Sequence, residues 1–201
     1  MKASTVYLIT PLAKNFPIDP QADYIGIDQG YQLILQKHLV CTKAIGDFDS
    51  ASSADFPLPQ QSLVFPVEKD ETDSQLAMEY AVDAGYEKII LWGGLSGRLD
   101  HTLANLLAAG WSYPQVILQD ESHKVITLLE GEHILQEPYR HVSFFALEDS
   151  MITLENFKYE AQNRLLSRKD IYAVSNAFEK GKQAKITLQW GRVLCILSNE
   201  V

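Results

Sequence analysis

Short apolar runs alternate with helix-like patterns through the first 120 residues of the chain. Polar or turn-forming residues bound each run, which is typical of buried strands joined by helices and loops. The runs cover residues 6–9, 24–27, 43–45, 62–65, 88–92 and 115–118. This alternation predicts an α/β fold class, with a mostly parallel sheet flanked by helices in an N-terminal domain of residues 1–120.

Two helices are predicted with defined ends. Thr72 and Gln75 form a T-x-x-Q capping box ahead of an apolar stripe, so one helix should start at Thr72 and end at Gly85. The second should run from Leu99 to Ala109, because leucines 99, 103, 106 and 107 fall on one helical face. Gly110 is placed to terminate it.

The pattern changes after Asp120 to short β-type runs separated by turn signals. Glu130-Gly131 and Trp190-Gly191-Arg192 resemble tight connections between strands. The runs cover residues 125–128, 133–135, 141–146, 151–154, 185–189 and 193–197. We therefore expect a C-terminal all-β sandwich domain over residues 121–201.

Composition narrows the classes of function. The chain has 201 residues, 46% of them hydrophobic, and a net charge of −9, so it can bury a core but lacks the basic stripe of a nucleic-acid binder. An anionic ligand would therefore need bound cations. No stretch approaches a membrane span, and the apolar run before Pro11 is too short for a signal peptide. A cytoplasmic protein without nucleic-acid or membrane partners is expected.

The first candidate site is acidic and follows a predicted strand. Asp47 and Asp49 flank Phe48, and in extended backbone residues two apart face the same way, so both carboxylates could hold one cation. Hard oxygen ligands suit Mg²⁺. A solvated acidic turn, with Asp49 or Ser50 capping the next segment, is an equal alternative.

Two further segments carry candidate ligand groups. Asp73 opens the capped helix, where a carboxylate complements the helix dipole or binds metal, and Lys69 beside it could serve as a point charge for phosphate. Residues 93–101 contain three glycines before the second helix, a pattern that lets backbone N–H groups approach phosphate.

Side chains around that glycine-rich turn add further donors and acceptors. Arg98 offers a fork of donors, Asp100 lies in the first helical turn, and His101 and Asn105 share a helix face. All these segments follow successive strands, and the carboxyl ends of parallel strands are where open α/β sheets bind ligands. We expect one shared ligand site.

These motifs resemble those of the thiamine pyrophosphokinase family. The resemblance lies in AIGDFDS at 44–50, KDETD at 69–73 and GGLSGRLDHTLAN at 93–105, with a weaker match at 174–178. It implies a catalytic α/β domain, a thiamine-binding β-sandwich and a homodimer with active sites at the interface. The implied reaction converts ATP and thiamine to thiamine diphosphate and AMP.

The resemblance also implies roles for individual residues. Metal ligands would be Asp47, Asp49, Asp73 and Asp100 around Mg²⁺, and the catalytic set would be Asp73, Asp100, Arg98 and His101. Nucleotide contacts would come from Asp28, Gly93, Gly94, Lys69, Thr72 and Asn105, and thiamine contacts from Ser175 and Asn176. The chain departs from the family pattern at Asp28-Gln29-Gly30, where a DGG segment is common, and at Ile9-Thr10-Pro11, where glycines are usual.

Other interpretations remain open at this point. A nucleotide-sugar glycosyltransferase also uses a D-x-D after a strand, but it leaves residues 93–105 and the second domain without a role. A non-catalytic thiamine or nucleotide sensor would keep the fold and lose the activity. For Trp190, a place in the sandwich core is favoured over stacking on thiamine.

Overall fold

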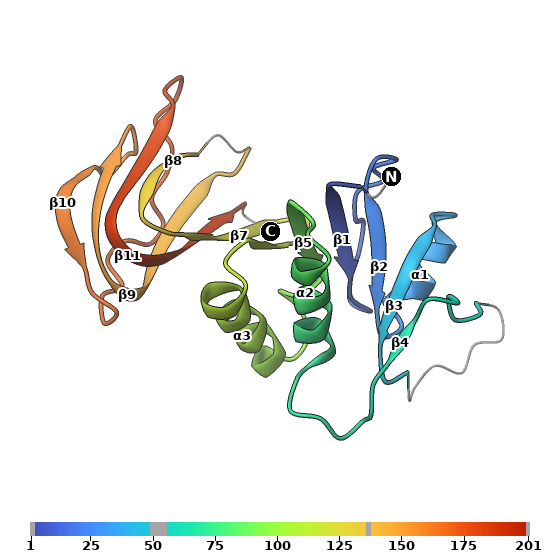
Figure 1. The fold of residues 1–201 in the computed structure, drawn as a ribbon. Helices are drawn as coiled ribbons and strands as arrows, with labels where there is room; N and C mark the ends of the chain where they lie inside the picture. Colours follow the sequence, from blue (N-terminus) through green and yellow to red (C-terminus); the bar gives the residue numbers. More distant parts are fainter. Residues whose placement is uncertain (1–2, 49–55, 136–137, 200–201) are drawn as a thin grey trace. The chain divides into compact units, whose positions relative to one another are not determined.

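The computed structural model describes residues 3–48, 56–135 and 138–199 (Figure 1). It divides into two compact units, Met1–Glu121 and Ser122–Val201. The first is an α/β unit and the second consists of β-strands, so the expected fold class is confirmed. None of the helices in the described ranges has the length and apolar character needed to cross a bilayer.

The first unit is built on a parallel sheet with the strand order β6-β5-β1-β2-β3-β4. Its strands are β1 (Thr5–Ile9), β2 (Asp23–Ile27), β3 (Cys41–Gly46), β4 (Leu63–Val64), β5 (Lys88–Trp92) and β6 (Val116–Gln119). Each coincides with a predicted apolar run. Four of the five residues in β1, β2 and β5 are buried, as expected for strands covered on both faces.

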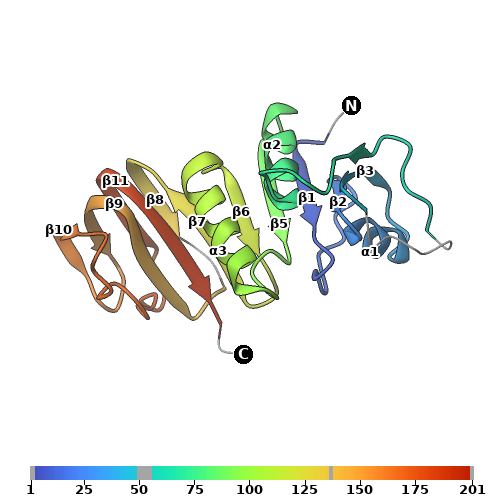
Figure 2. The ribbon, with the colours of Figure 1, turned by 90° about the horizontal axis from the view of Figure 1, so that it is seen from below.

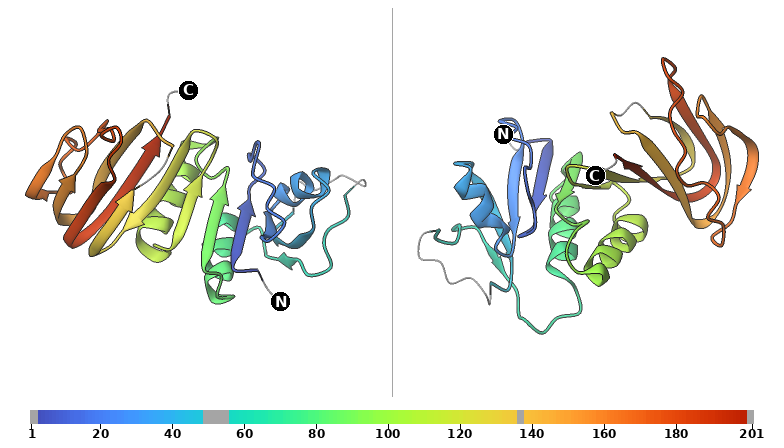
Figure 3. Two further views of the ribbon diagram at one scale, coloured as in Figure 1. Left: turned by 90° about the horizontal axis from the view of Figure 1, so that it is seen from above. Right: turned by 180° about the vertical axis from the view of Figure 1, so that it is seen from behind.

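Three helices belong to this unit: α1 (Gly30–Gln36), α2 (Asp73–Asp83) and α3 (Leu99–Leu107). Figures 2 and 3 show α1 and α2 on opposite faces of the sheet. The predicted start of α2 is confirmed, because the Thr72 side chain accepts a hydrogen bond from the Gln75 N–H at 3.1 Å. Its predicted end is also confirmed, since Gly85 follows the last turn with a φ of +74°.

The end of α3 differs from the prediction. Gly110 does not terminate the helix, because α3 ends at Leu107 and the chain continues as a π-helical turn over Ala108–Ser112. The Tyr113 N–H closes this wider turn on the Ala108 carbonyl at 2.8 Å. The turn accommodates the buried Gly110 and carries the chain on toward β6.

The order of strands creates a switch point between β1 and β5. From β1 the chain proceeds to β2, β3 and β4 on one side, and then returns through α2 to form β5 on the other side of β1. The connections beyond β1 and β5 therefore diverge. The carboxyl ends of these strands border a crevice, where ligands bind in open α/β sheets.

The second unit is an antiparallel β-structure with the strand order β10-β9-β11-β7, in which β8 also pairs with β11. Its strands are β7 (His123–Leu128), β8 (Gly131–Leu135), β9 (His141–Glu155), β10 (Ala161–Leu166) and β11 (Ala184–Ser198). The predicted connection at Glu130-Gly131 does lie between β7 and β8. The predicted runs 141–146 and 151–154 belong to one strand, as do 185–189 and 193–197, because β9 and β11 each continue for 15 residues. Trp190-Gly191-Arg192 forms register shifts inside β11, because Gly191 packs against Ser150 of β9.

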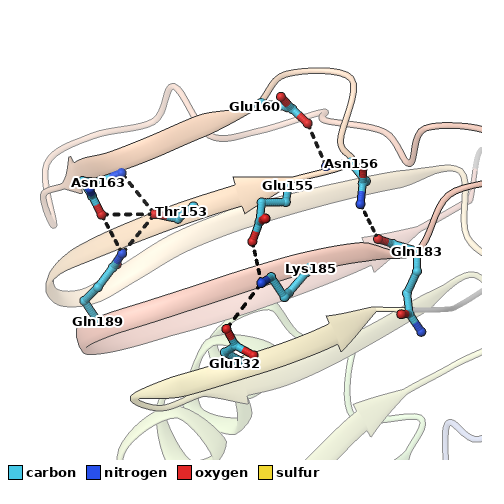
Figure 4. Close-up of polar contacts among 9 residues, drawn as sticks. All are labelled: Glu132, Thr153, Glu155, Asn156, Glu160, Asn163, Gln183, Lys185 and Gln189. Atoms are coloured by element: carbon cyan, nitrogen blue, oxygen red, sulfur yellow. Dashed lines mark hydrogen bonds and ion pairs between the residues drawn. The ribbon is translucent and has the colours of Figure 1, made fainter.

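Both halves of the long strands contribute to one core in this unit. Phe144 and Ile152, from opposite halves of β9, are fully buried in the same cluster, and Phe157 meets Phe144 edge-on at 5.7 Å. The bent strands therefore wrap around a shared interior, as in layered β-domains. On the outer face, Lys185 pairs with Glu155 at 2.7 Å and Glu132 at 3.3 Å (Figure 4).

The two cysteines have structural roles. Among the described residues neither forms a disulfide, and Cys195 is buried in the core of the second unit. Burial raises the pKa of the Cys41 thiol to about 11, so almost none of it is thiolate at neutral pH. Neither residue has the features of a nucleophile.

Candidate active site

A cavity of about 220 Å³ lies at the carboxyl ends of β1, β2 and β5, beside the N-termini of α2 and α3. This is the switch point of the sheet, so the topology places the cavity where ligand binding is expected. Its lining consists of Thr10, Pro11, Leu12, Ile27, Asp28, Thr72, Asp73, Ser74, Gly93, Gly94, Ser96, His101 and Asn105.

Asp28 reaches the cavity through an unusual backbone conformation. Its φ is +46°, in the left-handed region that aspartate tolerates better than most residues. The Asp28 N–H donates to the Ile45 carbonyl at 2.8 Å, which fixes the turn after β2. Position 30, two residues further on, requires glycine because a Cβ there would overlap the Ile9 carbonyl. Backbone strain of this kind is common at ligand sites.

A lysine joins two of the predicted metal ligands. Lys69 Nζ lies 2.8 Å from Asp73 Oδ1 and 3.7 Å from Asp47 Oδ2, and it also donates to the Pro66 carbonyl at 3.2 Å. The three side chains are largely buried, with exposed fractions of 12% for Lys69, 17% for Asp47 and 23% for Asp73. Two carboxylates therefore face one cation, the ammonium group of Lys69.

The turn after β5 is held by an asparagine from α3. The Asn105 Nδ2 donates to the Gly94 carbonyl at 2.9 Å, and Asn105 is the buried member of α3. Gly93 has a φ of +86° and packs closely against Thr10 and Ala13. A glycine at this position is thus required both by the backbone conformation and by space.

Arg98 and Asp100 pair with each other outside the cavity lining. Arg98 donates to both carboxylate oxygens of Asp100, with distances of 3.1 Å from Nε and 2.6 Å from Nη2. Arg98 holds the pKa of the Asp100 carboxyl below its ordinary value, and the hydrogen bond from the His101 N–H acts in the same direction. Both side chains are more than 60% exposed, so water screens this pair strongly.

The structure therefore gathers part of the expected acidic cluster. Asp47 and Asp73 converge on Lys69, whereas Asp100 is engaged by Arg98 and does not line the cavity. Asp49 lies outside the described residues. Within the described ranges, no three side chains of His, Cys, Asp or Glu lie close enough to form a metal site alone.

The geometry after β3 also differs from the expectation. The strand ends at Gly46, and Phe48 has a φ of +55°, so the backbone is not extended through this segment. The Phe48 ring packs edge-on against Tyr31, with ring centroids 6.0 Å apart. A turn governed by Phe48 packing, in place of strand alternation, thus sets the direction of Asp47.

Comparison with known proteins gives matches to both units. Residues 19–116 match the model of the thiamin pyrophosphokinase catalytic domain, and residues 132–193 match that of the thiamin pyrophosphokinase vitamin B1 binding domain. Together these matches cover well over half of the chain. The chain belongs to the thiamin pyrophosphokinase family. Membership makes it an enzyme, a transferase of diphosphate groups that acts in thiamine pyrophosphorylation.

Individual relatives agree with this assignment. Thiamine pyrophosphokinase of Bacillus subtilis is 28% identical over 169 residues, which cover 79% of each chain. A crystal structure of a thiamin pyrophosphokinase family protein from Enterococcus faecalis superimposes with a TM-score of 0.86 and 27% identity, over 98% of this chain and all of that one. Thiamin pyrophosphokinase from Geobacillus thermodenitrificans has a TM-score of 0.84 and 25% identity, over 98% of both chains.

The proposed thiamine contacts lie in the vitamin B1 binding match but differ in accessibility. The Asn176 amide is buried and engaged at both ends: Nδ2 donates to the Tyr159 carbonyl, and Oδ1 accepts from the N–H groups of Tyr159 and Ala177. Ser175 is exposed. Trp190 is 44% exposed, so its expected place in the core is wrong: the register shifts in β11 turn it outward.

Several cavity residues were missed by sequence reasoning. Thr10, Ser74 and Ser96 line the cavity, yet none was named as a ligand contact, although Ser96 lies within the glycine-rich segment 93–101. Thr10 directly follows the first buried strand. Its place directly after a strand could have identified Thr10 as a candidate, because the strand ends of an open α/β sheet border its ligand crevice.

Proposed function

We propose that this thiamin pyrophosphokinase family enzyme transfers the pyrophosphoryl group of ATP to the hydroxyl of thiamine, with Mg²⁺, giving thiamine diphosphate and AMP. The observation that carries the proposal is the convergence of the Asp47 and Asp73 carboxylates on the Lys69 ammonium group. This pairing lies beside a glycine turn at the switch point of the sheet. A polyphosphate needs both a cation and backbone donors, and this site supplies a place for each.

The donor set fits Mg²⁺. This ion prefers oxygen ligands and is usually held by one or two carboxylates together with substrate phosphates. Asp47 and Asp73 would provide these carboxylates once Lys69 releases them, and Asp28 lines the cavity together with Asp73. When bound, the ion would neutralise phosphate charge. Asp49 and Asp100 remain proposed ligands, although Asp100 would first have to leave its pair with Arg98.

The remaining cavity residues would orient the phosphates and the acceptor. Lys69, which pairs with the cavity residue Asp73 without itself lining the cavity, would add positive charge near the carboxylates. Asn105 would keep the Gly93-Gly94 turn in place through the Gly94 carbonyl. Asp28, Gly94 and Thr72 complete the proposed nucleotide contacts from the lining. Positioning and electrostatics account for most catalysis of phosphoryl transfer.

The chemical step forms one bond and breaks another. The thiamine hydroxyl oxygen attacks the β-phosphorus, the bond from that phosphorus to the oxygen bridging it to the α-phosphate breaks, and AMP leaves. The hydroxyl proton passes to a nearby base. Asp73 and His101 line the cavity whereas Asp100 does not, which favours the first two as the proton acceptor.

Thiamine binding is assigned to exposed groups of the second unit. Ser175 would contact thiamine directly, whereas Asn176 would shape the segment through its buried hydrogen bonds. Trp190 has enough exposed surface to stack on an aromatic ring. The carboxylates around the cavity would also favour the thiazolium cation.

The proposed function is tested by incubating the purified protein with ATP, Mg²⁺ and thiamine and measuring AMP. We expect AMP and thiamine diphosphate in equal amounts, with both lost on chelation by EDTA and restored by Mg²⁺. Thiamine binding without AMP release would instead support a sensor. Transfer from a nucleotide sugar, with no AMP from ATP, would support a glycosyltransferase.

We further propose that the enzyme is a homodimer that uses the exposed face of α3. Leu99, Leu103 and Leu107 recur every four residues with exposed fractions of 81%, 54% and 45%, and Trp111 extends the row at 44%. The leucine face predicted from the sequence therefore remains largely uncovered within this chain. An exposed apolar row of this kind is typical of a surface that binds another protein.

Replacing Leu103 by aspartate should convert the dimer to a monomer, because the substitution would bury a charge in an apolar interface. The mass would be measured by size-exclusion chromatography with light scattering at several concentrations. Ile18→Asp, at a residue that is 63% exposed and is not part of α3, should leave the mass unchanged. A dimeric Leu103→Asp variant would place the interface elsewhere.

A further inference from the structure

Thr10 occupies a position in the cavity that no motif identified. It follows β1 directly, and its N–H donates to the carbonyl of Trp92, the last residue of β5, at 3.1 Å. Thr10 thus links the carboxyl ends of β1 and β5, the two strands between which the switch point lies. It is 6% exposed and lines the cavity together with Asp28 and Gly94.

The hydroxyl of Thr10 accepts one hydrogen bond but donates none in the described part of the chain. Its Oγ1 accepts from the Leu12 N–H at 3.3 Å, which shapes the turn after β1. Within the described ranges the hydroxyl donates to no acceptor. A buried donor without an acceptor is destabilising unless a partner arrives, and this one lines a cavity.

We propose that Thr10 is a ligand-contact residue whose hydroxyl donates a hydrogen bond to a phosphate oxygen of the nucleotide. This inference rests on the proposed function for the identity of the ligand. It assigns a role to a residue that precedes the catalytic-domain match, which begins at residue 19.

The surroundings of Thr10 favour phosphate over other hydrogen-bond acceptors. Gly93 packs directly against Thr10 Oγ1, and the N–H of the next residue, the buried Gly94, also has no acceptor in the described part of the chain. Two unused donors on adjoining segments suit an anion with several oxygens. At about 220 Å³ the cavity is smaller than pockets that enclose whole drug-sized ligands, and a phosphate chain matches it better.

The test compares Thr10→Val, which keeps the shape and loses the hydroxyl, with Thr10→Ser, which retains the hydroxyl. Affinities for Mg-ATP, Mg-pyrophosphate and thiamine would be measured separately by calorimetry. We expect Thr10→Val to weaken Mg-ATP and Mg-pyrophosphate each about tenfold, in line with one lost hydrogen bond to a charged group. Thiamine affinity should be unchanged, and Thr10→Ser should stay within about twofold of the parent.

Thr42→Val is the matched control. The Thr42 hydroxyl donates to the Tyr24 carbonyl at 2.9 Å and lies outside the cavity lining, so its loss should leave all three affinities unchanged. Thermal unfolding by circular dichroism verifies that each variant is folded. If Thr10→Val unfolds, Thr10→Ala provides the same comparison with a smaller side chain.

Two outcomes would overturn the role of Thr10. One is parental affinity of folded Thr10→Val for both phosphate ligands, and the other is a loss confined to thiamine. Either result with normal AMP formation by the parent leaves the proposed function standing. Conversely, a parent that forms no AMP contradicts the proposed function, while the pyrophosphate measurements still decide whether Thr10 contacts phosphate.

Discussion

Replacing Asp73 by asparagine will lower the turnover of thiamine to thiamine diphosphate by about 10²- to 10³-fold, the scale seen when one charge-stabilising group is removed from an active site. The substitution keeps the shape of the side chain and removes its negative charge. Asp73 is largely buried, lines the cavity and pairs with Lys69, so the loss leaves one fewer carboxylate for the metal. AMP release at saturating ATP and thiamine measures the effect.

Asp83→Asn is a matched control on the same helix. Asp83 is the exposed last residue of α2, about 15 Å along the axis from Asp73 by helical rise. Its removal should leave turnover unchanged, and stability should rise slightly, because a carboxylate opposes the dipole at a helix C-terminus. Asp73→Asn turnover within threefold of the parent at saturating Mg²⁺ would show that Asp73 is neither metal ligand nor base.

Gly93→Ala should destabilise the protein by about 3–5 kcal/mol and abolish nucleotide binding in the fraction that folds. Two effects add at this residue. The φ of +86° disfavours any side chain, and the new Cβ would lie 2.7 Å from the Ala13 backbone nitrogen and closer still to Thr10 Oγ1. Backbone atoms cannot rotate away as a flexible side chain can, so the turn itself must shift. Urea unfolding followed by circular dichroism measures the loss.

Gly85→Ala separates the two effects. Gly85 has a similar φ of +74°, and nothing lies within 4 Å of the Cβ that alanine would add. This control should lose only about 1–2 kcal/mol, the contribution of a left-handed backbone conformation. Equal losses for the two variants would show that the contacts of Gly93 with Thr10 and Ala13 do not contribute to stability.

Local sequence patterns determined most of the secondary structure. The parallel strands of the first unit were predictable because each is a short apolar run between turn-forming residues, and the start of α2 because Thr72 and Gln75 cap it through contacts three residues apart. The location of the ligand segments was also predictable, because the carboxyl ends of parallel strands meet at one edge of the sheet. The family was recognisable because its motifs are contiguous segments.

Patterns that depend on distant contacts were harder to interpret. The leucine face of α3 was visible in the sequence, but periodicity identifies a face and not what covers it, and Leu99 and Leu103 are exposed. Likewise, Trp190-Gly191-Arg192 looked like a turn. It is instead a register shift, because Gly191 meets Ser150 more than 40 residues away in the chain.

The sequence by itself thus determined the fold class, the family and the segments that border the cavity, since each is written in residues close together along the chain. Only the tertiary structure decided which side chains meet. It joined Asp47 and Asp73 through Lys69, paired Asp100 with Arg98, and buried Thr10 at the switch point with a hydroxyl that donates to no acceptor among the described residues. The reason is physical: a charged or polar side chain takes its role from the partners that folding brings within a few ångströms, and those partners come from other strands and helices.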